Sequence, residues 1–354
     1  MQKFMKGVAV YEKDHVELVD DIPVPQVGDY GALIRIHACG LCNGTDLHII
    51  DGSLTKKEGL GAFPTILGHE GCGEVVELGP KVRHIQLGDR YIRPNMDPTD
   101  KYTMTYGNMA QYGLVVDHQA MREDGFSDAE LPYFGNEVKG YSPNFGRIPN
   151  DVDYIDGGAL LNLCESYNAV HDFGIGAGAS VLVYGCGPMG LGNMNVMRAL
   201  GARRVVAVDG IPERLELAKE NAHVDAVINF REQPVAEALH GEKFDFVMDA
   251  VGSTAILEEG SQFLVPGGKA CSFGVLSAGK DLINLHNLQN NTCVHVHMQP
   301  YKRFEVIPAV VELMRQGKLD PKKFYSHVMP LEEIHRAIAM VKAKEALKII
   351  LTID

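Results

Sequence analysis

The sequence predicts an α/β protein with two parts, a mainly-β domain and a domain built on a doubly wound parallel sheet. Three observations predict this class. The chain has 354 residues, which exceeds one average domain. Up to about residue 150, short strand-like segments alternate with turns. From about Asp156, continuous apolar strands alternate with helical stretches, a pattern typical of parallel sheets covered on both faces.

The individual elements follow from local periodicity and turn residues. Partly alternating strands are expected at 6–11, 32–37, 73–78 and 110–116, and they indicate a small antiparallel barrel or distorted sandwich. In the parallel part, strands are expected at 180–184, 204–209, 226–229, 244–249 and 269–273, with helices at 188–200 and 212–221. The tail supplies two helices and a last strand at 347–352. We assign it to the first domain, which gives residues 1–154 with 297–354, and residues 155–296.

Composition narrows the class of function. The chain carries 33 Lys and Arg against 46 Asp and Glu, a net charge of −13, which argues against a nucleic-acid partner. It shows neither an apolar run long enough to cross a bilayer nor a basic-then-apolar start typical of a signal peptide. Seven cysteines spread over a long chain favour reduced thiols. A cytoplasmic enzyme without a membrane partner is expected.

One segment, 117–146, lacks periodicity but carries Phe126, Tyr133, Phe134, Tyr141 and Phe145. A long loop of this kind in a compact domain is often functional. It could be a substrate lid, a subunit contact or a surface excursion held by its aromatic side chains.

A dinucleotide site is predicted where strand 181–184 runs into the glycine-rich turn GCGPMG and then a helix. Gly185 allows the tight turn, Gly187 allows a pyrophosphate to approach the backbone, and Gly190 allows close helix–strand packing. The helix start, at Pro188 and Met189, offers free N–H groups to phosphates.

The next strand ends in Asp209, 19 residues after Gly190. A carboxylate there binds ribose hydroxyls and repels a 2′-phosphate, so NAD is expected rather than NADP, with Arg214 beside the adenine.

Metal-ligating residue types gather in three pieces: Cys39 and Cys42 in CGLCNGTDLH, His69 and Glu70 after a glycine, and Cys164 with Glu165 near the domain junction. Thiolate, imidazole and carboxylate suit zinc, and a catalytic zinc site uses three protein ligands with one open position. Taken singly, Cys39 and Cys42 could be a redox CxxC pair, and His69 could be a core histidine.

With these motifs the sequence resembles the zinc-dependent medium-chain dehydrogenases, the family of alcohol, sorbitol and threonine dehydrogenases. The resemblance covers essentially the whole chain and is carried by GLCNGTDLH, ILGHEGCGEVVELGPKV, LGDR and GCGPMGLG. It implies a GroES-like, mainly-β catalytic domain combined with a Rossmann NAD-binding domain.

The resemblance also implies roles for individual residues. Cys42 and His69 would be zinc ligands, Glu70 a carboxylate that binds or exchanges with the metal, and Cys164 a further ligand, with Glu165 as its alternative. Asp46 would orient His69. Thr45 and His48 would relay the proton of the alcohol.

Two departures from the family pattern stand out. Thr45 lies three residues after Cys42 where the family has two, so Asn43 or Gly44 is an insertion, and alignment from the right would put Asn43 on the ligand position. We prefer Cys42, because an amide oxygen is a poor zinc ligand beside a thiolate. Residues 90–122 contain no cysteine, so a structural zinc is not expected and each chain should hold one zinc.

The expected reaction is hydride transfer between NAD and a secondary alcohol of the polyol, sugar or sugar-acid class. The nicotinamide would lie near the ends of two later strands, at Val251, Phe273, Gly274 and Val275. The alternatives are a metal-free NADPH-dependent reductase of the same superfamily, a non-catalytic NAD-binding protein and a redox CxxC protein.

Two further features concern metal and assembly. His295 and His297 alternate on an expected strand and so should face the same way, either as a second metal site or in a sheet-edge or substrate-pocket position. The resemblance implies a homodimer or homotetramer, with the sheet edge at 292–297 as a joining surface.

Overall fold

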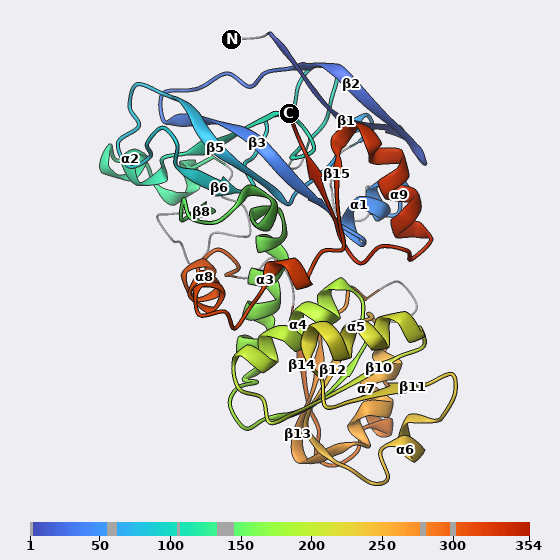
Figure 1. Cartoon of the computed structure of the whole chain (residues 1–354). Coiled ribbons are helices and arrows are strands. Elements are labelled where there is room, and N and C mark those ends of the chain that lie inside the picture. The colour runs from blue at the N-terminus through green and yellow to red at the C-terminus, as the bar shows by residue number, and fades with distance from the viewer. Residues whose placement is uncertain (1–2, 55–61, 105–106, 133–144, 277–280, 298–301) are drawn as a thin grey trace. The chain divides into compact units, whose positions relative to one another are not determined.

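The computed structural model describes residues 3–54, 62–104, 107–132, 145–276, 281–297 and 302–354. The chain divides into two compact units, one formed by Met1–Leu161 with Tyr325–Asp354 and the other by Asn162–Phe324 (Figure 1). The last strand therefore groups with the first unit, whereas residues 302–324 group with the second unit. The sequence had assigned all of 297–354 to the first domain.

The first unit is mainly β, as predicted. Its strands are β1 (Phe4–Glu12), β2 (His15–Pro23), β3 (Gly31–Leu41), β4 (Thr65–Ile66), β5 (Gly71–Leu78), β6 (Arg90–Ile92), β7 (Tyr112–Val116), β8 (Arg147–Ile148), β15 (His327–Pro330) and β16 (Ile349–Thr352). They form one sheet in the order β2-β1-β4 and another in the order β15-β16-β3-β5-β6-β8, with β7 also paired to β3. The helices α1 (Thr45–Ile50), α2 (His118–Glu123) and α9 (Ile334–Lys342) and the 3₁₀ turns η1 (Asp128–Glu130) and η4 (Leu331–Glu333) complete it.

The chain's last segment belongs to the core of this unit. Buried apolar side chains of β1, β3, α9 and β16 share one cluster, including Val8, Ile34, Ile338 and Leu351. The pairing of β16 with β3 brings Ile349 opposite Leu41. Strand β2 was not predicted, because most of its side chains are exposed and its apolar residues do not alternate.

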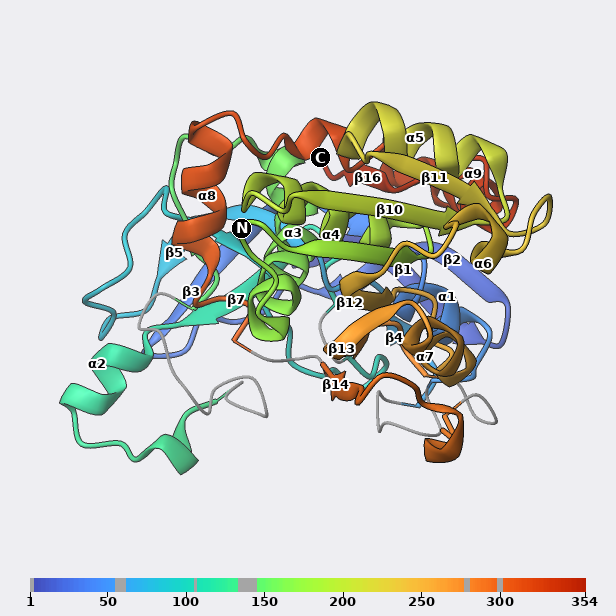
Figure 2. The same ribbon diagram turned by 90° about the horizontal axis from the view of Figure 1, so that it is seen from below.

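The second unit contains the predicted parallel sheet. Its strands are β9 (Ser180–Tyr184), β10 (Arg204–Asp209), β11 (Ala226–Asn229), β12 (Phe244–Asp249), β13 (Leu264–Ser272) and β14 (Cys293–Val296), all parallel in the order β11-β10-β9-β12-β13-β14 (Figure 2). Its helices are α4 (Pro188–Ala199), α5 (Pro212–Ala222), α6 (Val235–Ala238), α7 (Thr254–Ser261) and α8 (Ile307–Arg315), with 3₁₀ turns η2 (Leu285–Asn287) and η3 (Pro321–Lys323). Every residue of β9 is buried, which confirms that central strands of this sheet are covered on both faces.

One long helix, α3 (Tyr154–Phe173), had no counterpart in the prediction. Most of its side chains are buried, so it lacks the polar stripe by which an amphipathic helix is recognised. Two glycines in its first turns allow close packing: a Cβ on Gly157 would lie 2.3 Å from Cys72 Sγ, and one on Gly158 would lie 3.1 Å from Ile350 Cγ2.

The aperiodic segment 117–146 begins with helix α2. Phe126 packs edge-to-face on Tyr30 at 5.6 Å between ring centroids, and Phe145 lies 6.4 Å from His118. Tyr133, Phe134 and Tyr141 lie outside the described residues. Across the described part of the chain, no helix has both the length and the apolarity that a bilayer crossing requires.

Candidate metal centre and nucleotide site

Strand pairing brings the candidate metal ligands together. Cys42 directly follows β3, and His69 and Glu70 directly precede β5. Because β3 and β5 are antiparallel neighbours, with Cys39 opposite Gly71, the end of one strand lies beside the start of the other. Gly40 N also donates to Glu70 O at 3.2 Å. Residues almost 30 positions apart in sequence therefore meet at one end of the sheet.

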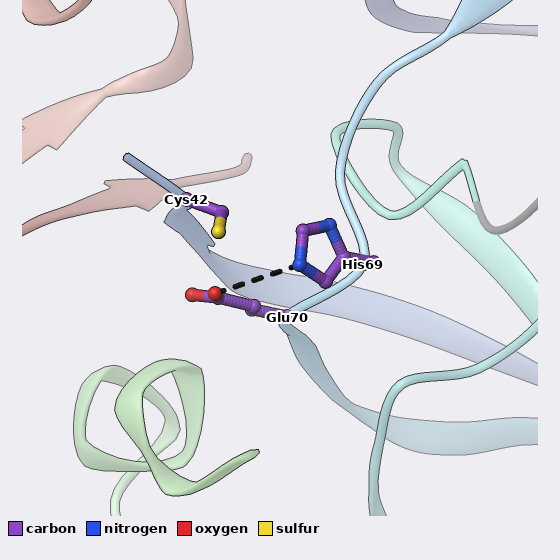
Figure 3. A group of neighbouring side chains, drawn as sticks. All are labelled: Cys42, His69 and Glu70. Carbon is purple, nitrogen blue, oxygen red and sulfur yellow. Dashed lines mark ion pairs between the residues drawn. The ribbon is translucent and has the colours of Figure 1, made fainter. Parts of the chain in front are cut away.

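The three side chains converge on one point (Figure 3). One potential ligand atom from each of Cys42, His69 and Glu70 lies within 4.8 Å of the other two, and no other such group of three occurs among the residues that the structure describes. His69 Nε2 is 3.7 Å from Glu70 Oε1. His69 is 8% exposed and Glu70 1% exposed, whereas Cys42 is partly exposed.

Asp46, at the start of α1, holds two of these residues. Its Oδ2 accepts a hydrogen bond from Cys42 N at 2.8 Å, and its Oδ1 lies 3.3 Å from His69 Nδ1. Burial lowers the pKa of His69, whereas Asp46 and Cys42 raise it by more, so that it lies well above its ordinary value. The contact on Nδ1 leaves Nε2 directed at Glu70 and Cys42, which is the arrangement a metal-ligating histidine needs.

Lys348 was missed by the sequence analysis and lies against the same group. Its Nζ is 2.5 Å from Glu70 Oε2 and donates to Leu41 O at 3.3 Å, and the residue is only 2% exposed. Burial lowers the pKa of Lys348, but Glu70 and Cys42 raise it by more. The sequence did contain a signal for Lys348. It adjoins the apolar run that forms β16, and a lysine that is buried with such a strand almost always has a partner of opposite charge.

The donor set fits zinc. Thiolate, imidazole and carboxylate are its usual protein ligands, and three of them leave the fourth position that a catalytic site needs. Within the described part of the chain, Glu70 Oε1 is buried and accepts no hydrogen bond. A buried carboxylate oxygen without a donor is costly, and a bound cation would satisfy it.

Cys164 and Glu165 lie in the second unit, on α3. Cys164 is fully buried, and burial raises the pKa of its thiol. Glu165 is engaged elsewhere, because its Oε1 lies 2.5 Å from Nη1 of the buried Arg303. Ligation of a metal by Cys164, or by Glu165 as its alternative, stays a prediction.

The expected proton carriers both lie on α1. Thr45 is its first residue, and the side chain of His48 is half exposed. His48 Nδ1 lies 3.0 Å from Ser53 Oγ and 3.6 Å from Asp51 Oδ2.

The glycine-rich turn between β9 and α4 has the predicted local geometry. Gly185 has φ +100°, which favours glycine, and Gly187 precedes Pro188 at the helix start. A Cβ on Gly190 would lie 1.9 Å from Gly185 O, so a side chain cannot fit there. A Cβ on Gly187 would meet only Arg214 Nη1, at 3.9 Å.

Asp209, at the end of β10, faces this turn. Its Oδ2 accepts from Cys186 N at 2.7 Å, and its Oδ1 accepts from Gly210 N and Ile211 N at 2.7 and 3.0 Å. The carboxylate therefore holds the glycine-rich turn and the start of the next loop together.

The loops that follow β12 and β13 contact each other. The buried Asp249 accepts from the N–H groups of Val251, Gly252 and Ser253 at 2.8–2.9 Å. A Cβ on Gly274 would lie 2.1 Å from Gly252 N, so the two loops are in direct contact. The side chains of Val251 and Val275 are exposed, while Phe273 packs beside His297 at 6.2 Å between ring centroids.

His295 and His297 do face the same way, since both contact Asp172. His297 Nδ1 lies 2.8 Å and His295 Nε2 3.1 Å from the same oxygen, Asp172 Oδ2. Among the described residues these three do not form a three-ligand metal group, and the sheet-edge and substrate-pocket positions stay predictions.

Two protein-family models match this chain, one in each of its two units. The family "Alcohol dehydrogenase GroES-like domain" matches residues 28–124, and the family "Zinc-binding dehydrogenase" matches residues 188–316. Sorbitol dehydrogenase of Ovis aries is 26% identical over 349 residues, covering 95% of this chain and 93% of that protein.

Solved structures share the fold over the whole chain. An alcohol dehydrogenase from Thermus sp. ATN1 is 26% identical with a TM-score of 0.76, covering 99% of this chain and all of that one. An alcohol dehydrogenase from Escherichia coli CFT073, solved with NADH, is 20% identical with a TM-score of 0.80 and the same coverage. With both family matches in order along the chain, the protein belongs to the zinc-dependent medium-chain dehydrogenases.

Proposed function

We propose that this protein transfers hydride between NAD and a secondary alcohol of the polyol, sugar or sugar-acid class, using one zinc ion per chain. The observation that carries the proposal is the convergence of Cys42 with the buried His69 and Glu70. The likeness to a sorbitol dehydrogenase over almost the whole chain supports the substrate class. The first unit would be the catalytic domain and the second the nucleotide-binding domain.

Cys42, His69 and Glu70 would hold the zinc, with Cys164 as a further candidate ligand. Zinc held there would supply Lewis acidity to an alcohol hydroxyl, and NAD would supply the hydride acceptor. Asp46 keeps His69 Nε2 directed at the site through its contact with Nδ1. The hydroxyl of Thr45 would receive the alcohol's proton first. The half-exposed imidazole of His48 would pass it towards solvent.

The glycine-rich turn would hold the coenzyme. The backbone at Gly187 is open to a close ligand, and the start of α4 at Pro188 and Met189 presents the N–H groups and positive dipole end that suit a pyrophosphate. Asp209 would bind a ribose hydroxyl and repel a 2′-phosphate, with Arg214 beside the adenine. The nicotinamide would lie by Val251 and the segment Phe273, Gly274 and Val275.

We also propose a reducing, cytoplasmic setting and a homodimer or homotetramer. All seven cysteines are free in the structure, which supports a compartment in which thiols stay reduced.

The proposal is tested by zinc analysis combined with a substrate screen. The purified protein should contain one zinc per chain and reduce NAD⁺ with polyols or sugar acids. Cys42→Ala should lose the zinc and the activity, because it removes the thiolate ligand. Cys39→Ala is the matched control and should keep both.

Other outcomes would support other functions. Unchanged zinc content in Cys42→Ala would refute the ligand assignment. A zinc-free protein that oxidises NADPH would indicate the metal-free reductase, and NAD binding without turnover on any alcohol would indicate a non-catalytic protein. Equal loss of activity in Cys39→Ala and Cys42→Ala, without zinc, would indicate a redox pair.

A further inference from the structure

The buried lysine beside the candidate metal centre has no place in the proposed reaction. Lys348 directly precedes β16, and the pairing of β16 with β3 delivers it to the end of the sheet where Cys42 and Glu70 lie. Its Nζ reaches Glu70 Oε2 at 2.5 Å and Leu41 O at 3.3 Å. Neither Lys348 nor Glu70 is more than 2% exposed, so water does not screen their charges.

The two oxygens of Glu70 have different surroundings. Oε2 is held by the Lys348 ammonium, whereas Oε1 faces His69 Nε2 at 3.7 Å and accepts no hydrogen bond among the described residues. Lys348 therefore determines which oxygen is directed at the ligand group. A metal that binds Oε1 must share the carboxylate's charge with the ammonium on the other oxygen.

A second contact fixes the geometry of this pair. Asn43, the residue after Cys42, donates its Nδ2 to Leu347 O at 2.8 Å, next to Lys348. Together with the bond from Lys348 to Leu41 O, it ties the loop that carries Cys42 to the segment that carries the lysine. Lys348 is thus held in place relative to the ligands on both sides.

We propose that Lys348 is a positioning residue that holds Glu70 as a single-oxygen, weakened ligand and thereby sets the affinity of the site for zinc. The proposal rests on the zinc-dependent function above. The balance of charge gives the effect a direction: the ammonium attracts the charge of Glu70 towards Oε2 and so withdraws carboxylate charge from a metal bound at Oε1, which weakens metal binding through Glu70. A lysine that served only to neutralise a buried carboxylate would leave metal affinity unchanged, or its loss would lower that affinity.

The test is the zinc dissociation constant, measured by competition with a chromophoric chelator, on the full-length protein. Lys348→Gln keeps a hydrogen-bond donor for Glu70 but removes the charge, and it should bind zinc at least about tenfold more tightly, on the Coulomb estimate for charges a few ångströms apart. Lys348→Met should show the same direction. Lys348→Arg, which keeps the charge, should stay close to the wild-type value.

A second background shows whether the lysine acts through Glu70. In Glu70→Gln the amide carries no charge for Lys348 to hold, so adding Lys348→Gln should change zinc affinity much less than it does in the wild type. The absorption spectrum of the Co²⁺-substituted protein gives an independent readout, and it should change in Lys348→Gln but not in Lys348→Arg.

The outcomes separate this inference from the proposed function. Failure of the wild-type protein to bind zinc would refute the proposed function, and this inference with it. Zinc binding by the wild type with unchanged or weaker affinity in Lys348→Gln and Lys348→Met would overturn only the role of Lys348. An equal gain in the Glu70→Gln background would show a general charge effect and would also overturn it.

Discussion

Asp46 is a buried side chain that contacts two of the three candidate metal ligands. One of its oxygens receives the backbone N–H of Cys42 and the other lies beside His69 Nδ1, so it orients two ligands at once. It is fully buried at the start of α1, where the helix dipole also favours a negative charge.

Asp46→Asn should therefore weaken zinc binding by about 10- to 100-fold, the range seen when such an orienting partner is changed. The physical reason is that a neutral amide no longer favours the Nδ1–H tautomer of His69. Chelator competition measures the change. Asp51→Asn, at the exposed end of the same helix, is the control and should leave zinc affinity unaltered. Equal zinc affinity in Asp46→Asn and wild type would refute the orienting role.

At the scale of elements, two glycines of the turn from β9 to α4 differ in the space around them. At Gly190 a side chain would collide with the backbone at 1.9 Å, whereas at Gly187 the nearest atom would be 3.9 Å away. The first glycine is required for the helix to approach the strand. The second leaves space that the protein itself does not fill.

This contrast predicts two different phenotypes. Gly190→Ala should lower the free energy of unfolding by about 1–3 kcal/mol or more, the usual cost of overpacking. Gly187→Ala should leave stability within about 1 kcal/mol, because among the described residues beyond its chain neighbours the added methyl group would meet only Arg214 Nη1, at an ordinary contact distance of 3.9 Å. It should nevertheless weaken NAD binding, since the methyl would occupy the space proposed for the pyrophosphate. Denaturant unfolding and coenzyme titration measure the two effects, and NAD affinity unchanged in Gly187→Ala would argue against that placement.

At the scale of the whole molecule, stability against acid follows from its paired carboxylates. A hydrogen bond from Tyr154 holds the pKa of Glu74 below its ordinary value, and Arg204 does the same for Glu242. For Asp225, burial raises the pKa, but Val205 N and Arg198 lower it by more. Burial acts alone in the opposite direction on Asp249, whose pKa is raised despite three backbone donors.

The signs then predict the pH dependence. A carboxylate whose pKa is lower in the folded state stabilises the protein above its unfolded pKa, and this contribution is lost as the pH falls through the folded value. Asp249 contributes with the opposite sign. Among these four carboxyl groups, three have a lowered pKa and one has a raised pKa. The free energy of unfolding should therefore decrease as the pH drops below about 4.5, the ordinary pKa of glutamate.

Urea unfolding at a series of pH values measures this loss. Glu74→Gln should reduce the slope of the free energy of unfolding against pH in the acid range. A free energy of unfolding that rises on acidification would contradict the lowered pKa values of these carboxyl groups.

Much of the fold can be predicted from local sequence, and so can the candidate metal ligands, but not the lysine that contacts Glu70. The parallel strands are recognisable because each is a short, continuous apolar run, and the glycine-rich turn because its spacing serves one backbone geometry. Cys42, His69 and Glu70 are identifiable because few residue types bind zinc. Helix α3 escaped prediction, since burial on nearly all sides removes the period that marks a helix.

The sequence by itself determined the two-part α/β architecture, the glycine-rich turn and the types of ligand, because these depend on periodicity and residue chemistry within short segments. Only the tertiary structure decided that Lys348 is paired with Glu70, that Glu165 is bound to Arg303, and that Asp172 joins His295 and His297. Those contacts join positions more than 100 residues apart. They depend on which strands and helices become neighbours and in what register, and no local pattern encodes that.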